Sequence, residues 1–78
     1  MINLEEFSAE NNEIVEIPES IGNLKSLKYL DLGANKIQFT PQTLGALKNL
    51  ETLILTKNSI EKKPDFIQNL KSLKKLIM

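Results

Sequence analysis

A repeat of 23 residues, which runs through this 78-residue chain without insertion or deletion, constrains the fold more than any other feature. Eight sets of positions spaced by 23 hold the same or a similar type of residue. The sets are Leu4, Leu27, Leu50 and Leu73; Phe7, Leu30, Leu53 and Leu76; Ala9, Leu32, Leu55 and Met78; Asn12, Asn35 and Asn58; Ile14, Ile37 and Ile60; Pro18, Pro41 and Pro64; Ile21, Leu44 and Ile67; and Leu24, Leu47 and Leu70. A unit this short cannot cover its own apolar face, so neighbouring copies must stack into a solenoid.

Each repeat divides into an expected strand, a turn and an outer segment. Leu30 and Leu32 alternate with Asp31, and a period of two residues indicates a short strand with the leucines on one side. Asn35 follows where the chain must turn, and its amide can bond to backbone groups of adjacent turns, so we expect a ladder of stacked asparagines. Pro41 then starts an outer segment whose apolar residues lie three and six positions later, a spacing that suits a 3₁₀ or loose helical turn.

Together these residues spell L-x-x-L-x-L-x-x-N-x-I followed by P-x-x-I/L-x-x-L, and the chain resembles the leucine-rich-repeat family over essentially its whole length. The repeat length and the Ile-Pro-Glu-Ser-Ile-Gly-Asn-Leu sequence at 17–24 are similar to the bacterial repeats of spirochaete type and to the plant Ras-group-related type. The resemblance implies an α/β fold: one right-handed solenoid domain over 1–78 with about 3.3 repeats, four parallel strands on the concave face and 3₁₀ or short helical turns on the convex face. The repeats start at Leu4, Leu27 and Leu50, with a partial one from Leu73.

One column of the repeat changes character along the chain. Ile17 is matched by Thr40 and Lys63, which weakens the expected core at that column in the second and third repeats. Phe39, one place earlier, is expected to compensate in part. For both Phe39 and Phe66, core packing is the favoured interpretation.

A second departure concerns glycine, and a third concerns the two ends. Gly22 and Gly45 are matched by Gln68, so we expect the third outer segment to be more regularly helical. The chain begins at the first expected strand and stops at Met78, where the fourth ends. No capping segment is visible, although solenoid ends normally need one.

Composition argues against an enzyme. There is no Cys and no His, which removes thiolate chemistry, the commonest general base and the commonest metal ligand. No Gly-rich phosphate loop or metal-ligand cluster occurs, and the adjacent Glu5 and Glu6 would point to opposite sides of a strand. We therefore expect no catalytic residue, no cofactor and no metal. No signal peptide is visible in residues 1–10, and no apolar run is long enough to insert into a membrane.

The concave surface is where leucine-rich repeats usually bind, so the resemblance implies a protein partner there. The variable positions of the expected strands supply the candidate contacts, which are Glu6, Tyr29, Asp31, Thr52, Ile54 and Ile77. Tyr29, Ile54 and Ile77 stand out because they place apolar surface on a face that should be wet.

Two groups of charged residues each have two interpretations. The row Glu5, Lys28, Glu51 and Lys74 is either a solvated face that neutralises itself or a ligand contact, and the first is favoured. The lysine pairs at 62–63 and 74–75 raise the possibility of nucleic acid, but without Arg or flanking aromatic residues a solvated face is favoured and no nucleic acid is expected.

The net charge of zero conceals a gradient that favours self-association as the alternative function. Residues 1–24 carry six Glu and no Lys or Arg, a net charge of −6, whereas residues 25–78 carry ten Lys and four acids, a net charge of +6. An acidic first repeat could dock on the basic fourth strand of another copy, or two fourth strands could pair through an edge formed by Lys75, Leu76, Ile77 and Met78. A further interpretation is that the chain is a piece of a longer repeat protein.

Overall fold

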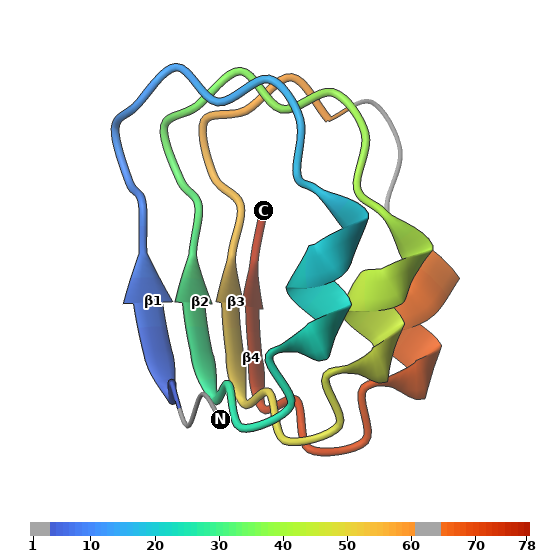
Figure 1. The fold of residues 1–78 in the computed structure, drawn as a ribbon. Coiled ribbons are helices and arrows are strands. Elements are labelled where there is room, and N and C mark those ends of the chain that lie inside the picture. The colour runs from blue at the N-terminus through green and yellow to red at the C-terminus, as the bar shows by residue number, and fades with distance from the viewer. Residues whose placement is uncertain (1–3, 61–64) are drawn as a thin grey trace.

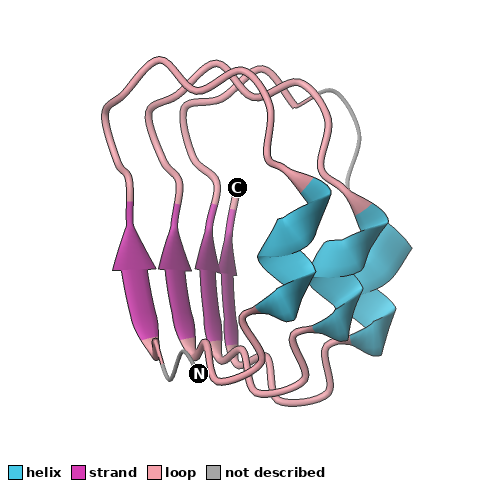
Figure 2. Cartoon of the chain, in the orientation of Figure 1, coloured by secondary structure: helices cyan, strands magenta, loops and turns pink. Residues whose placement is uncertain are grey.

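A computed structural model describes residues 4–60 and 65–78, and there one parallel sheet faces a row of short helical turns across an apolar core (Figures 1 and 2). Every strand has three residues and every 3₁₀ helix has five. In chain order the elements are β1 (Glu6–Ser8), η1 (Glu19–Asn23), β2 (Tyr29–Asp31), η2 (Gln42–Ala46), β3 (Thr52–Ile54), η3 (Asp65–Asn69) and β4 (Lys75–Ile77).

The sheet has the strand order β1-β2-β3-β4 and its register equals the sequence repeat. Phe7 pairs with Leu30, Leu30 with Leu53, and Leu53 with Leu76, so each step across the sheet is a step of 23 residues. Successive repeats therefore place equivalent side chains side by side. The expected α/β solenoid, with four parallel strands on one side and 3₁₀ turns on the other, is confirmed.

The asparagines form the expected ladder. Asn35 accepts hydrogen bonds at Oδ1 from the backbone N–H groups of Asn12 and Ile14, both at 3.1 Å, and donates from Nδ2 to the carbonyl of Leu32 at 2.9 Å. One turn later, Asn58 accepts the backbone N–H of Ile37 at Oδ1 and also donates to the carbonyl of Leu32, both at 2.9 Å. Because backbone groups at the strand ends have no sheet partner, these amides satisfy them.

Proline begins the first two outer turns, as predicted. Pro18 and Pro41 precede η1 and η2 with φ of −67° and −73°, the range that the pyrrolidine ring imposes, and neither turn has a side-chain cap. The proline holds its own backbone in an extended conformation, and the chain passes from the loop into the helical segment at the next residue.

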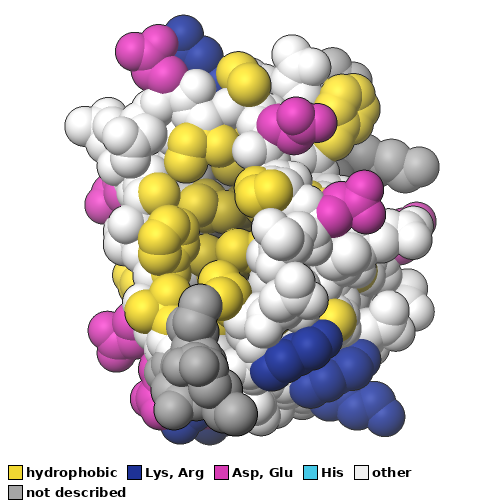
Figure 3. All heavy atoms as spheres, viewed as in Figure 1, with side chains coloured by type: hydrophobic (Ala, Val, Ile, Leu, Met, Phe, Trp, Pro, Cys, Tyr) yellow, Lys and Arg dark blue, Asp and Glu magenta, His cyan; other side chains and the backbone are white. Residues whose placement is uncertain are grey.

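The core lies between the sheet and the turns and is complete only in the middle of the chain. Among the described residues seven large side chains are fully buried, and all fall between residues 27 and 53: Leu27, Leu30, Ile37, Leu44, Leu47, Leu50 and Leu53. Leu4 and Phe7, their counterparts in the first repeat, are 37% and 38% exposed. Figure 3 shows the consequence, a gathering of apolar side chains between the strand and the helical turn of the first repeat. A side chain of the repeat is fully buried only where an equivalent side chain of the next repeat lies on each side of it.

The expectation that Phe39 packs in the core is wrong. Its side chain is 78% exposed, whereas Phe66 is 4% exposed and does belong to the core. Phe39 lies in an extended segment that forms a parallel bridge to Glu16. Neighbouring side chains of an extended segment point to opposite sides, so Thr40, which shares the inward column of Ile17, forces the ring outward.

The expectation of a more regular helix in the third outer segment is also wrong, because η3 is a five-residue 3₁₀ helix like η1 and η2. The glycines serve close packing instead. A Cβ at Gly22 would lie 2.7 Å from the carbonyl oxygen of Thr43, and one at Gly45 would lie 3.1 Å from Cβ of Phe66. Gln68 occupies the same column but is exposed, so it meets no such restriction.

Within residues 4–60 and 65–78, the structure contains no helix with the length and apolar character needed to cross a membrane.

Candidate functional site

The open face of the sheet, defined as the side turned away from the core, carries the side chains at the first and third positions of each strand. Two rows run across the strands: Glu6, Tyr29, Thr52 and Lys75 form the first, and Ser8, Asp31, Ile54 and Ile77 form the second. Lateral neighbours in a row are about 5 Å apart. The middle residues, such as Leu30 and Leu53, point into the core and are fully buried.

Tyr29 is surrounded by negative charge. Its ring is half-buried, and the pKa of its hydroxyl is raised above the ordinary value by burial, then by the carboxylates of Asp31 and Glu10, with a hydrogen bond to Asp31 and a smaller effect of Glu6. All three acids lie on β1, β2 or the residues that follow them. The first two strands therefore form the acidic half of the open face.

Asp31 is held in place and offers little surface of its own. It is 8% exposed, and its Oδ1 accepts a hydrogen bond from the backbone N–H of Gly33 at 3.0 Å. This contact orients the carboxylate at the end of β2. Asp31 acts on the open face mainly through its charge.

The other half of the face is apolar in its second row only. Ile54 and Ile77 are paired by the register of β3 and β4, and both are half-buried, as is Thr52 beside them. Lys75 is exposed at the far end of the first row. The structure thus brings the six candidate residues from the sequence onto one surface that changes from acidic to apolar along the sheet.

The alternating row Glu5, Lys28, Glu51 and Lys74 lies just before the strands and forms no salt bridge with any residue in 4–60 or 65–78. Among the described residues the one salt bridge joins Lys36 Nζ to Glu13 Oε1 at 3.5 Å, outside this row. The backbone of the row is engaged instead: the carbonyl of Glu5 accepts from the N–H of Lys28 at 2.7 Å and of Tyr29 at 3.0 Å. The row contributes to the sheet rather than to a visible charge network.

Other features that the sequence singled out are less concentrated. The lysines at 62 and 63 lie outside the described residues, and Lys74 and Lys75 are exposed. Leu76 and Ile77 are half-buried on β4, and Met78 is 47% exposed. The part of the chain that the structure describes contains no group of three or more acidic, His or Cys side chains that could hold a metal ion.

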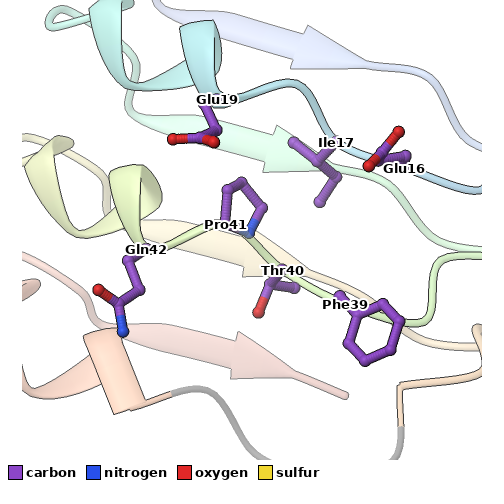
Figure 4. A pocket seen from close by; sticks show the side chains of 7 residues that line it. All are labelled: Glu16, Ile17, Glu19, Phe39, Thr40, Pro41 and Gln42. Atoms are coloured by element: carbon purple, nitrogen blue, oxygen red, sulfur yellow. The ribbon is translucent and has the colours of Figure 1, made fainter.

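Sequence reasoning missed a cleft of about 370 Å³ on the flank of the solenoid, between the segments that lead into η1 and η2 (Figure 4). It is lined by Glu16, Ile17, Glu19, Phe39, Thr40, Pro41 and Gln42. One signal was present in the sequence. Because Thr40 shares a column with the inward-facing Ile17, Phe39 had to point outward and stand beside Glu16.

Three features together define a short α/β solenoid. They are a parallel sheet whose register matches a 23-residue repeat, an asparagine ladder, and 3₁₀ turns opposite the strands. The sequence family described as leucine-rich repeat region matches residues 2–78, and the chain belongs to the leucine-rich-repeat family. This fold is in general that of a protein-interaction module, and such modules are typically not enzymes.

Two solved structures resemble the chain closely in fold. An internalin from Listeria monocytogenes is 28% identical with a TM-score of 0.76, over 88% of this chain and 20% of the internalin. A leucine-rich-repeat protein from Leptospira interrogans is 34% identical with a TM-score of 0.70, over 97% of this chain and 25% of that protein. The chain therefore spans between a fifth and a quarter of the length of these relatives. No curated protein matches it significantly.

Proposed function

We propose that the chain binds a protein partner through the open face of the sheet, with Tyr29, Ile54 and Ile77 at the centre of the contact. The observation that carries the proposal is the strand register, which sets these three side chains in adjoining rows over three neighbouring strands. Glu6, Asp31 and Thr52 complete the surface.

The chemistry of this face suits protein recognition. Tyrosine is enriched at the centres of protein interfaces because its ring buries apolar area while its hydroxyl keeps a polar contact. Ile54 and Ile77 each leave part of an aliphatic side chain in contact with water, and burial of that area against a partner is favourable. The strands are fixed by the asparagine ladder and the sheet, so little conformational freedom would be lost on binding.

The test begins with capture of a partner by the full chain, followed by titration calorimetry of the purified pair. Tyr29→Ala and Ile54→Lys should each raise Kd by about fivefold or more, because truncation or charging of a central contact costs more than about 1 kcal/mol. Val15→Lys is the matched control, since it makes the same kind of change at a side chain that is 63% exposed and lies outside the strands. The proposal fails if Tyr29→Ala and Ile54→Lys fold normally and bind the partner as tightly as the Val15→Lys control.

A second candidate function is self-association through β4. Leu73 and Leu76 are only partly buried, whereas their equivalents Leu27 and Leu30 are fully buried. Two modes of association would cover that surface. Two copies would pair through the edge formed by Lys75, Leu76, Ile77 and Met78, or this basic end would dock on the acidic first repeat of a second copy. Sedimentation velocity at low and high salt tests it: head-to-tail association should weaken as salt screens the charges, and a monomer at every concentration would exclude both modes.

A further inference from the structure

The flank cleft has a composition that the open face does not share. Figure 4 shows Glu16 and Phe39 at one end of it, Glu19 and Gln42 at the other, and Ile17, Thr40 and Pro41 between them. The lining comes from the extended segments that precede η1 and η2 and from the first residue of each of these helices, so it is separate from the rows of the sheet.

The fold explains why residue 39 points outward, but it does not explain why a residue exposed there is aromatic. At 78% exposure it is the most exposed large apolar side chain among the described residues, although the chain has only three phenylalanines and one tyrosine. Its backbone is fixed by the parallel bridge to Glu16, so the ring projects from an ordered segment. A fixed aromatic ring in water is available surface for a ligand.

The charged side chains among the described residues that line the cleft are acidic. Glu16 and Glu19 are both exposed, and the described residues that line the cleft include no lysine or arginine. The first repeat, which supplies Glu16 and Glu19, has the same sign, because residues 1–24 hold six Glu and no basic residue. An anionic ligand would be repelled here, and a purely apolar one would remove water from two carboxylates without giving them a partner.

A cationic side chain suits both the exposed aromatic ring and the nearby carboxylates. A guanidinium or ammonium group over the face of Phe39 is attracted by the ring quadrupole, and the Glu16 carboxylate can accept its hydrogen bonds. The aliphatic stem of such a side chain would then lie along Ile17 and Pro41, which form the apolar middle of the cleft. Arginine fits best, since its planar group stacks on a ring and bonds a carboxylate at the same time.

We propose that the flank cleft is a second recognition site, which takes an arginine side chain from a basic peptide segment and holds the guanidinium between Phe39 and Glu16. It does not depend on the open face of the sheet, and either site can be lost without the other. Glu19 and Gln42 at the far end accept a second donor of the same segment.

The test uses the full chain, isotope-labelled, and the peptide acetyl-Gly-Arg-Gly-amide, followed by two-dimensional NMR. Saturable shifts are expected at the amides of Glu16, Ile17, Phe39 and Thr40. The same peptide with citrulline in place of arginine keeps the shape and removes the charge, and it should give no saturable shift. Phe39→Leu and Glu16→Gln should each raise Kd by about two- to fivefold, the range of one exposed cation–π contact or one surface ion pair.

Glu5→Gln is the matched control, because it removes the same charge from an exposed acid beside β1, outside the cleft. It should leave Kd unchanged. Equal weakening by Glu5→Gln and Glu16→Gln would overturn the proposal, because binding would then follow net charge alone. Binding of the citrulline peptide as tight as that of the arginine peptide would overturn it too. Phe39 and Glu16 are exposed, so their variants should fold, and unfolding curves check this directly.

Discussion

Replacement of Asn35 by alanine should destabilise the chain more than the same change at either of the other ladder asparagines. The Asn35 side chain is 7% exposed. Its Oδ1 accepts two backbone N–H groups, both at 3.1 Å, while Nδ2 lies 2.9 to 3.1 Å from three carbonyl oxygens, between which its two protons are shared. Four hydrogen bonds are therefore lost together.

The magnitude follows from these contacts. Each lost hydrogen bond costs about 0.5–1.5 kcal/mol, and water can reach the exposed backbone at Asn12, so we expect a total of about 2–4 kcal/mol. A chain of 78 residues has a free energy of unfolding of about 4–12 kcal/mol. Asn35→Ala should thus remove a large part of the stability. Urea unfolding followed by far-ultraviolet circular dichroism, extrapolated linearly to water, measures the difference.

Two further variants sharpen this prediction. Asn12 is exposed and donates to the carbonyls of Ala9 and Glu10, so Asn12→Ala should cost about 1 kcal/mol or less. Asn35→Asp keeps the oxygen that accepts the two N–H groups but turns a second acceptor toward the carbonyls, and it should be at least as harmful as alanine. Equal costs at Asn12 and Asn35, or a stable Asn35→Asp variant at neutral pH, would refute the ladder as the source of stability.

Three other outcomes are expected. Gly22→Ala should destabilise by about 1–3 kcal/mol in thermal unfolding, because the new Cβ meets the backbone of the next turn at 2.7 Å. Phe66→Ala should cost about 3–5 kcal/mol and Phe39→Ala less than about 0.5 kcal/mol, a contrast that chemical unfolding resolves. The pKa of Tyr29, read from tyrosinate absorbance, should lie above about 10 and fall in Asp31→Asn. Since the native state keeps this proton longer, stability should decline as pH rises above the ordinary tyrosine pKa.

The repeat by itself determined the architecture. A 23-residue period without gaps implies that equivalent residues meet equivalent neighbours, so the strand register, the stacked leucines and the asparagine ladder could all be predicted. The same logic placed Tyr29, Ile54 and Ile77 on one surface, because alternation along a strand decides which side chains share a face. These are periodic properties, and comparison of successive repeats is enough to read them.

Only the tertiary structure decided what happens where repeats touch. The burial of Asp31 and the need for glycine at 22 depend on which groups of the next turn come within contact distance. A repeat pattern records that neighbours exist but not how closely their backbones approach. The flank cleft is the clearest example: it exists because two extended segments run side by side with an outward ring on one and a carboxylate on the other.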